Sequence, residues 1–589
     1  MPGAGLSSAR AGTTVEGFSM KVCVVGAGPC GLTTVKQLLD EGHEVVCYDA
    51  YPDLGGIWLR DGDDGTKTKA FDNLYLTISM RLMAFSDFPF KGGRRFFTRQ
   101  QYLDYLVDYA NYYGLHDRIR FGSEVTDVRR TAGGYVVTVR RDGAEATEEF
   151  DAVALASGPF KTPHRDIPEL AGFTGEIVHS AQYRNAERFR DKRVLVVGLA
   201  ESGADIVREI GDVAAATTLA IRSYNYLLPR VVDDHRTTDS TTVRSHHHEM
   251  YDRATKVPVP YETFWGRSTV AKALFGAVSV VLGLARAVPG DVRDLKYRIR
   301  PGLARPTAAV NPMGEPVEPY KMDLDTLDDE PNWDLIHEWN AKSHPEGSWS
   351  PRTIFCKNVS FIPSIASGAV VVNDAGLAGS EGGTVRFRDG GSADYDAVVL
   401  CTGYQRDLTI GDLEVEDGNV RTLYRHFLHP DHDGRVAFIG FVRPFSGGIP
   451  VCAEMQARYF ARVLSGRLRP PADLERVIAA EKAWEEHWTA LSPRHTESHP
   501  SQVMYLDALA REIGCLVPMR SMLLNPKLFV QLWFGSFNPS GYRIVGPHAR
   551  REEATADLYS EPVEHEWMMC RQMSLLRFLP SSVHPKHSM

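Results

Sequence analysis

The feature that most constrains this chain is an apolar run followed by a glycine-rich turn and a helical pattern. Residues 21–25 read KVCVV, residues 26–31 read GAGPCG, and LTTVKQLLDEG comes next. A second apolar run, HEVVCYD, ends at Asp49. A Gly-x-Gly-x-x-Gly turn between a strand and a helix is typical of a βαβ unit that binds a dinucleotide. The pattern therefore predicts an α/β fold.

Each glycine of this turn has its own predicted role. Gly26 permits the tight turn, Gly28 lets backbone N–H groups approach a pyrophosphate, and Gly31 lets the helix pack against the strand. The N-terminus of the helix attracts the phosphate charge. Asp49 is placed to bind a ribose hydroxyl. These four residues form the first candidate cofactor site.

A second copy of the pattern begins at residue 193. The run RVLVV is followed by GLAESG at residues 198–203 and then by ADIVREIG. The same physical argument applies to this turn, so we expect Gly198, Ser202 and Gly203 to line a second phosphate site.

The second copy departs from the first at two positions. Its middle glycine is replaced by Ala200, whose methyl group should crowd a pyrophosphate. The next strand, TTLAIRS, ends near Arg222 and carries no acid. An arginine there suits a 2′-phosphate and favours NADP over NAD, and the alternative is a solvated charge at a strand end.

A third repeat supports the same plan. Residues 150–158 read FDAVALASG and residues 395–403 read YDAVVLCTG. We interpret both as strands that carry the chain between two nucleotide-binding units, and the alternative is coincidence between two buried strands. The predicted fold is two nested Rossmann-like dinucleotide-binding domains with an inserted, partly helical segment. The predicted layout is a flexible tail (1–19), a discontinuous first domain (20–185 and 385–548), a second domain (186–384) with an insertion at about 231–350, and a C-terminal extension (549–589).

Composition limits the classes of function. The chain has 589 residues, of which 43% are hydrophobic and 24% charged, as in globular proteins. A net charge of -9 argues against a nucleic-acid-binding protein. Eight cysteines are too sparse for a disulfide scaffold, which indicates a reducing, cytoplasmic location. The first 19 residues lack the apolar core of a secretory signal.

The most apolar window covers residues 273–285, ALFGAVSVVLGLA. It is shorter than the about 20 residues that a membrane-spanning helix needs. Two interpretations stay open: a buried core or partner-packing helix, or a helix in peripheral contact with a membrane.

Other chemistries find little support in the sequence. Three adjacent histidines, residues 246–248, cannot all face one ion on a regular element, so we predict a solvated loop and no metal site. No Cys-x-x-Cys pair follows the first turn, which argues against the disulfide reductases. No Gly-x-Ser-x-Gly sequence stands between a strand and a helix, so a hydrolase is unsupported.

A segment between the two turns carries a resemblance to a known family. FTGEIVHSAQYR places Phe173, Gly175, His179 and Tyr183 at the spacing Phe-x-Gly-x-x-x-His-x-x-x-Tyr, which resembles the fingerprint of class B flavin monooxygenases. The chain is similar to the flavin-containing monooxygenases over most of residues 20–550. The segments that carry this similarity are GGIW (55–58), FSDFPF (85–90), AFIGFVRPFSGGIPVCAEMQAR (437–458), YLDALAREIGC (505–515) and SGYRIVGP (540–547).

The resemblance implies a specific chemistry, similar to that of N,N-dimethylaniline monooxygenase. FAD is held by the first domain, with Gly56 and Trp58 among its contacts, and NADPH by the second. Reduced flavin reacts with O2 to give a C4a-hydroperoxide, which a soft nucleophile such as an amine nitrogen or a sulfur attacks. His179 organises the linkage between the domains. The implied partners are a small nucleophilic substrate and O2, and whether the chain forms a homo-oligomer stays open.

Three alternatives remain. The first is Baeyer–Villiger oxygenation of a ketone to an ester or lactone, although the fingerprint of that class typically ends in Trp-Pro and here ends in Tyr183-Arg184. The second is an NADPH oxidase that has lost oxygen transfer. The third is a non-catalytic flavin-binding protein, against which the intact first turn, Asp49 and Arg222 argue.

One candidate catalytic residue departs from the family pattern. Family members place an asparagine about eight residues before the FSDFP segment, and this chain has Thr77 there. A threonine hydroxyl is shorter than the amide and offers one donor. Our hypothesis is that Thr77 lines the flavin site, with help from Ser79, and affects the lifetime of the intermediate; the alternative is an ordinary strand residue.

Replacing Ala200 by glycine should tighten the binding of NADP+, because the turn then loses the methyl group beside the expected pyrophosphate. Titration of NADP+ into the two purified proteins measures the effect. Equal affinities would show that the methyl group does not crowd the nucleotide.

Overall fold

The computed structural model describes most of the chain and leaves several segments undescribed. The described residues are 18–60, 69–90, 96–233, 236–237, 242–245, 247–248, 260, 333–343, 355–405, 408–444, 447–489, 498–499 and 501–561. Nearly all of the predicted N-terminal tail, the apolar window 273–285 and most of the predicted insertion lie outside these residues.

The first of two five-stranded parallel sheets contains the first glycine-rich unit. Its strand order is β22-β7-β1-β2-β3. The predicted strand 21–25 is confirmed as β1, and β2 ends one residue before Asp49. The bounds of its strands are β1 (Lys21–Val25), β2 (Glu44–Tyr48), β3 (Ile119–Arg120), β7 (Ala152–Leu155) and β22 (Val436–Phe438).

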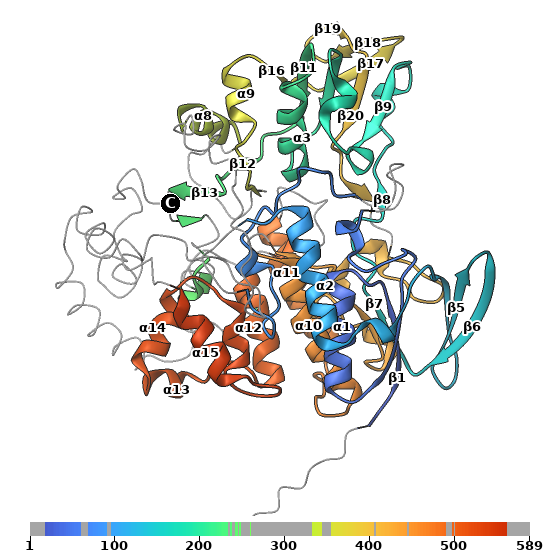
Figure 1. Cartoon of the computed structure of the whole chain (residues 1–589), viewed down its shortest axis with the longest axis vertical. Helices are drawn as coiled ribbons and strands as arrows, with labels where there is room; N and C mark the ends of the chain where they lie inside the picture. Colours follow the sequence, from blue (N-terminus) through green and yellow to red (C-terminus); the bar gives the residue numbers. More distant parts are fainter. Residues whose placement is uncertain are drawn as a thin grey trace, which may run out of the picture.

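The second sheet repeats this design with the strand order β16-β11-β10-β20-β9. Its central strand β10 covers Arg193–Val197, as predicted, and pairs in parallel with β11 and β20. The other bounds are β9 (Glu176–His179), β11 (Ala216–Ala220), β16 (Val370–Asn373) and β20 (Ala397–Leu400). Figure 1 shows this sheet with α3 in the upper body, and the first sheet with α1, α2 and α10 in the lower body.

The extent of the second sheet differs from the predicted layout. Strand β9 lies before residue 186 and β20 lies after residue 384, yet both pair within this sheet. The second unit therefore extends beyond the predicted span 186–384 at both ends. All five of its strands lie in sequence between β7 and β22 of the first sheet.

Two segments connect the sheets and lie side by side. The chain leaves the first sheet through β8 (Thr162–Pro163) and returns from the second through β21 (Tyr404–Gln405). These two short strands pair in an antiparallel manner.

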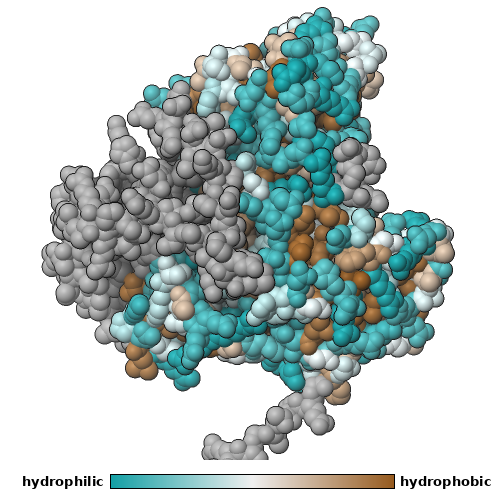
Figure 2. Space-filling model, viewed as in Figure 1, coloured by the Kyte–Doolittle hydropathy of each residue, from teal (hydrophilic) through white to brown (hydrophobic). Residues whose placement is uncertain are grey.

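Helices cover the sheets and complete the body. In the lower body, α10 packs against α1 and α12, and apolar side chains of all three join the core of the first sheet. None of the described helices is long and apolar enough to cross a membrane. Figure 2 shows a mostly hydrophilic described surface in this view, with apolar side chains gathered near the junction of the two bodies. The helix bounds are α1 (Pro29–Asp40), α2 (Arg99–Tyr113), α3 (Glu201–Gly211), α8 (Trp333–Ser343), α9 (Ile362–Ala366), α10 (Ile449–Leu464), α11 (Leu474–Thr489), α12 (Gln502–Ile513), α13 (Met519–Leu523), α14 (Pro526–Phe534) and α15 (Arg551–Ser560).

Smaller sheets and strand pairs complete the described elements. Two antiparallel sheets have three strands each: β4 (Glu124–Arg130), β5 (Tyr135–Arg141) and β6 (Ala144–Phe150), and β17 (Leu377–Glu381), β18 (Thr384–Phe387) and β19 (Ser392–Asp394). The strand pairs are β12 (Tyr226–Leu227) with β15 (Phe355–Cys356), β13 (Val231–Asp233) with β14 (Arg236–Thr237), and β23 (Arg443–Pro444) with β24 (Ser498–His499).

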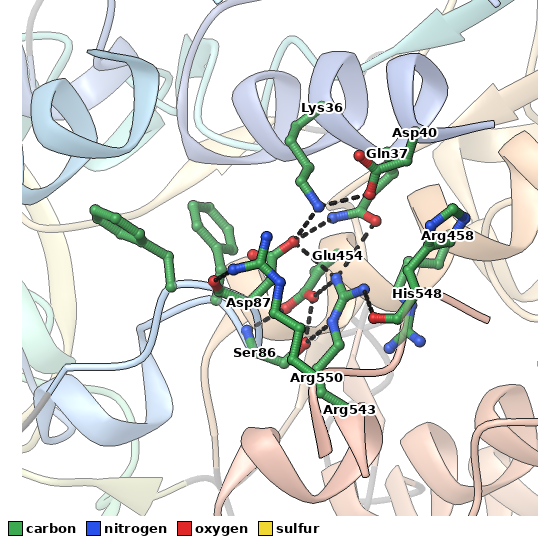
Figure 3. Close-up of polar contacts among 12 residues, drawn as sticks. Lys36, Gln37, Asp40, Ser86, Asp87, Glu454, Arg458, Arg543, His548 and Arg550 are labelled. Carbon is green, nitrogen blue, oxygen red and sulfur yellow. Dashed lines mark hydrogen bonds and ion pairs between the residues drawn. The ribbon is translucent and has the colours of Figure 1, made fainter. Parts of the chain in front are cut away.

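A buried network of charged side chains ties four separate segments together (Figure 3). The Arg543 guanidinium lies 2.8 Å from Asp87 and 2.7 Å from Glu454, and Lys36 on α1 lies 2.5 Å from Asp87. The backbone N–H of Ser86 donates to Glu454 on α10. Burial alone would raise the pKa of Asp87, but Arg543 and Lys36 hold it well below its usual range. The network therefore fixes α1 and α10 against the 85–90 segment and the C-terminal region.

Replacing Arg543 by leucine should lower the free energy of unfolding by about 3–5 kcal/mol, because Asp87 and Glu454 would stay buried without their shared cation. Urea unfolding followed by circular dichroism measures the loss. Arg140→Leu is the control: Arg140 pairs with Glu124 at the surface, with about half of each side chain exposed, so little change is expected. Equal stability of the two variants would contradict the argument.

Candidate functional site

The first glycine-rich turn has a geometry that two of its glycines make possible. Gly26 has a φ of 105°, and a Cβ there would lie 2.7 Å from the carbonyl oxygen of Ala156. A Cβ at Gly31 would lie only 1.7 Å from the carbonyl oxygen of Gly26. The helix α1 thus starts directly against the end of β1, and the fold itself requires both glycines.

Gly28 differs, because the fold does not require a glycine there. Its φ is −71°, and a Cβ would meet nothing nearer than the Cα of Gly56 at 3.6 Å. Pro29 then begins α1, which points its N-terminus at the turn. The protein fold would accept an alanine at Gly28. A glycine at this position therefore fits the close approach of a phosphate to the backbone.

The segment 55–58 packs against this turn. The N–H of Gly55 donates to the carbonyl oxygen of Ala27 at 3.0 Å, and Gly56 has a φ of 57° with its Cα facing Gly28. Trp58 is buried and meets Tyr102 edge to face, with ring centroids 4.8 Å apart. The structure therefore brings the predicted residue Gly56 next to the predicted phosphate site.

Asp49 connects the end of β2 to the same turn. One carboxylate oxygen accepts the N–H of Ala27 at 2.5 Å, and the other accepts that of Tyr51 at 2.7 Å. Burial raises the pKa of Asp49, and the two N–H groups oppose that shift. A carboxylate has further lone pairs for a ribose hydroxyl, so the predicted role is compatible with these bonds.

The second turn repeats the geometry of the first. Gly198 has a φ of 93°, and a Cβ there would lie 2.8 Å from the carbonyl oxygen of Cys401. A Cβ at Gly203 would lie 2.8 Å from the carbonyl oxygen of Gly198. Ala200 caps α3 in ordinary extended backbone, with φ −149° and ψ −163°, and its side chain is exposed. The alanine therefore causes no strain in the turn itself.

Ser202 and Arg222 are both exposed beside this turn. Ser202 lies in the first turn of α3, and Arg222 follows the end of β11 by two residues. The Arg222 side chain makes no hydrogen bond or ion pair with any other described residue. It is therefore available to a phosphate group.

The two units also match in the strands that follow them. Asp151 accepts the N–H of Lys21 at 2.8 Å, and Asp396 accepts the N–H of Arg193 at the same distance. Strands β7 and β20 pair with β1 and β10 in the same register. The predicted repeat of residues 150–158 and 395–403 is thus confirmed as a structural repeat.

His179 lies at the end of β9, beside the segment that returns to the first sheet. Its Nδ1 accepts the N–H of Ala181 at 3.0 Å, so Nε2 carries the proton and donates to the carbonyl oxygen of Gly403 at 3.0 Å. Burial lowers the pKa of His179 to about 4. A neutral, doubly hydrogen-bonded imidazole fits a role in the linkage and not in proton transfer.

Thr77 lies in a bend before the short 3-10 helix Met80–Leu82 and is half-buried. The alternative that Thr77 is a strand residue is wrong, because the bend belongs to no strand. The neighbouring Arg81 forms buried ion pairs with Asp557 at 2.5 Å and with Glu561 at 3.0 Å. The segment that carries Thr77 is thereby attached to α15, the last helix among the described residues.

The predicted solvated loop at residues 246–248 is wrong for the two histidines that the structure describes. His247 and His248 are buried, and their partners are Ser501 at 2.8 Å and Asp507 at 3.1 Å. The adjacent Arg244 forms a bidentate pair with Asp507. Within the described part of the chain, no three His, Cys, Asp or Glu side chains come together as a metal site.

No sequence pattern predicts the charged residues that lie around the second turn. Glu201, the first residue of α3, accepts the N–H of Lys357 at 2.9 Å, and Arg230 pairs with Asp205 at 3.0 Å. The motif defines only the glycine positions, so Glu201 gave no signal. Arg230 and Lys357 come from distant segments whose contact with the turn only the fold reveals.

Gly28→Ala and Gly31→Ala should separate cofactor binding from folding. Gly28→Ala should leave the apoprotein stable and weaken FAD binding, because its methyl group meets no protein atom closely and would crowd the pyrophosphate. Gly31→Ala should destabilise the apoprotein itself, because its Cβ would overlap the Gly26 carbonyl. Thermal unfolding of apoprotein and FAD titration measure the two effects. Equal loss of stability in both variants would contradict the assignment of Gly28.

The chain matches a known family and several curated relatives. The family described as Flavin-binding monooxygenase-like matches residues 19–257 and 348–560. The 4-hydroxybenzoate brominase (decarboxylating) of Marinomonas mediterranea is 32% identical over 558 residues, which are 93% of this chain and 94% of the relative. Human flavin-containing monooxygenase 2 is 27% identical over 547 residues, 90% of this chain and 89% of the relative.

Solved structures share the fold. An S-allyl-L-cysteine S-oxygenase from Allium sativum has a TM-score of 0.55 at 20% identity, and the match covers 92% of this chain and 99% of that one. The NADP+-bound cyclohexanone monooxygenase from Rhodococcus sp. Phi1 has a TM-score of 0.52 at 15% identity. That match covers 85% of this chain and 98% of the other. The two glycine-rich units and the family match over most of the sequence together lead to one conclusion: the chain belongs to the flavin-binding monooxygenase family and is an oxidoreductase that uses FAD and NADPH.

Proposed function

We propose that this chain transfers one oxygen atom from O2 to a soft nucleophile, an amine nitrogen or a sulfur, with FAD at the first sheet and NADPH at the second. The observation that carries the proposal is the recurrence of one turn geometry at the ends of β1 and β10. The site at β1, with Asp49 after the next strand, suits FAD. The site at β10, with Arg222 after the next strand, suits NADPH, which delivers electrons to the flavin.

The residues of the chain supply binding and placement. When bound, reduced flavin supplies the activation of O2. The N-termini of α1 and α3 would hold the two pyrophosphates, and Arg222 would pair with the 2′-phosphate. Neutral His179 holds the linkage between the sheets through Gly403. The Thr77 hydroxyl would offer a hydrogen-bond donor beside the flavin.

A second candidate substrate is a halide ion, which is also a soft nucleophile. The relatives at 32% identity are named 4-hydroxybenzoate brominase, whereas those named dimethylaniline monooxygenase or flavin-containing monooxygenase reach 27%. This difference favours a test of bromide with a phenolic acid acceptor. Baeyer–Villiger oxygenation gains less support, since the ketone-oxidising neighbours share only the fold.

We also propose that the enzyme acts in the cytoplasm. All seven described cysteines are free thiols, six of them buried, which is compatible with a reducing compartment. The sequence argument about the disulfide-poor composition points the same way.

Product analysis with labelled oxygen tests the proposal. The FAD-loaded protein is given NADPH, ¹⁸O₂ and, in separate reactions, a thioether, a tertiary amine, a ketone, and bromide with 4-hydroxybenzoate. A sulfoxide or N-oxide carrying one ¹⁸O supports oxygen transfer to nitrogen or sulfur. A brominated phenol supports the second candidate, and an ester the Baeyer–Villiger alternative. Hydrogen peroxide equal to the NADPH consumed in every reaction would identify an oxidase instead.

Thr77→Ala should raise the fraction of NADPH that ends as hydrogen peroxide, because the proposed hydrogen bond beside the flavin is lost. The ratio of peroxide to product, measured with the best substrate, gives the effect. Thr384→Ala is a matched control, since Thr384 is also half-buried but lies on β18 of another sheet. Identical ratios in wild type and both variants would remove Thr77 from the flavin site.

A further inference from the structure

An acidic side chain lies within the second glycine-rich turn. Glu201 is the first residue of α3, between Ala200 and Ser202. One of its carboxyl oxygens accepts the N–H of Lys357 at 2.9 Å. The other is buried and has no hydrogen-bond partner among the residues that the structure describes. A buried carboxyl oxygen without a partner is rare enough to need an explanation.

The surroundings of Glu201 are mostly cationic. Burial raises the pKa of Glu201 above its ordinary value, although the N–H of Lys357 and nearby cations oppose the shift. Those cations come from three different segments, after β12, after β15 and on β23. The charged and titratable groups that face Glu201 are Arg230, Lys357, Arg443 and the thiol of Cys356, and Asp205 on α3 pairs with Arg230.

These cations and the N-terminus of α3 all attract anions. An ionised Glu201 and the phosphates of a nucleotide would therefore compete for the same positive field. Like charges at close range disfavour ionisation of the carboxyl group, so an arriving phosphate favours its protonated form. Once protonated, Glu201 no longer repels the phosphate, and its O–H group becomes a hydrogen-bond donor.

We propose that Glu201 couples nucleotide binding to proton uptake: NADP+ and NADPH bind preferentially to the protein in which this carboxyl group is protonated. The proton comes from solvent and returns to it when the nucleotide leaves. The inference rests on the proposed function, in which the second turn holds the nucleotide. It makes Glu201 a residue that sets the affinity for the nucleotide and its dependence on pH.

Calorimetric titration of the FAD-loaded protein with NADP+ tests this directly. Measurements between pH 5.5 and 9 in two buffers of different ionisation enthalpy give the number of protons taken up. In the wild type, we expect uptake of up to one proton, and a Kd that rises by as much as about tenfold per pH unit where Glu201 ionises. In Glu201→Gln, the proton uptake that Glu201 contributes should vanish. The affinity of this variant for NADP+ at high pH should be higher than that of the wild type.

Two comparisons make the result specific to Glu201. Titration of the 2′-phosphate itself is common to all variants, so the difference between wild type and Glu201→Gln isolates this residue. Glu209→Gln is the matched control: it makes the same chemical change on α3, about 12 Å further along the helix, where Glu209 bonds to Tyr183. It should keep the proton uptake of the wild type.

The outcomes separate this inference from the proposed function. Wild-type protein that binds NADP+ without any proton uptake beyond that of Glu201→Gln would overturn the coupling and leave the function intact. Wild-type protein that does not bind NADP+ at all would overturn the proposed function. If Glu201→Gln fails to fold, as judged by its flavin spectrum, Glu201→Asn takes its place, and equal proton uptake in the wild type and that variant refutes the inference.

Discussion

The close contact between a helix and the glycine that ends a strand is the constraint on which this structure depends. At Gly31, even one methyl group would overlap the carbonyl oxygen of Gly26. The helix α1 therefore begins directly at the end of β1, with its N-terminus over the turn. The same contact, between Gly203 and Gly198, places α3 at the end of β10. The buried Arg543 network then fixes α1 against α10, so that the position of the turn is transmitted to the rest of the lower body.

Much of the fold could be predicted from sequence, because its signals are local. A buried parallel strand followed by a glycine-rich turn gives a short, recognisable pattern, and the predicted spans of β1 and β10 match the observed strands to the residue. Pairing between distant segments leaves no such pattern. β9 and β20 pair in one sheet although more than 200 residues separate them in the sequence. Arg543 and Asp87, which form an ion pair, are 456 residues apart in the sequence. For this reason the predicted span of the second unit, 186–384, leaves out β9 and β20.

The candidate site likewise contains residues that the sequence predicts and residues that it does not. The glycines could be found because backbone geometry permits no other residue at those positions, whereas the variable positions of the motif carry no such requirement. Glu201 occupies one of these variable positions, and its significance comes from Lys357, whose N–H reaches it from 156 residues away. The sequence does not predict the burial of His247 and His248, because a polar run resembles a solvated loop until its partners, Ser501 before α12 and Asp507 on it, are known.

The pairing of β8 with β21 restricts how the two bodies can move. The outgoing and returning segments form a single two-stranded ribbon, so any displacement of one sheet relative to the other acts on both segments together. A ribbon of this kind bends about an axis in its own plane more easily than it shears, because shear breaks the bonds between its strands. His179 donates to the carbonyl oxygen of Gly403, the residue directly before β21, and is thereby attached to one end of the ribbon. Displacement of the upper body therefore acts on both connecting segments and on the His179–Gly403 contact together.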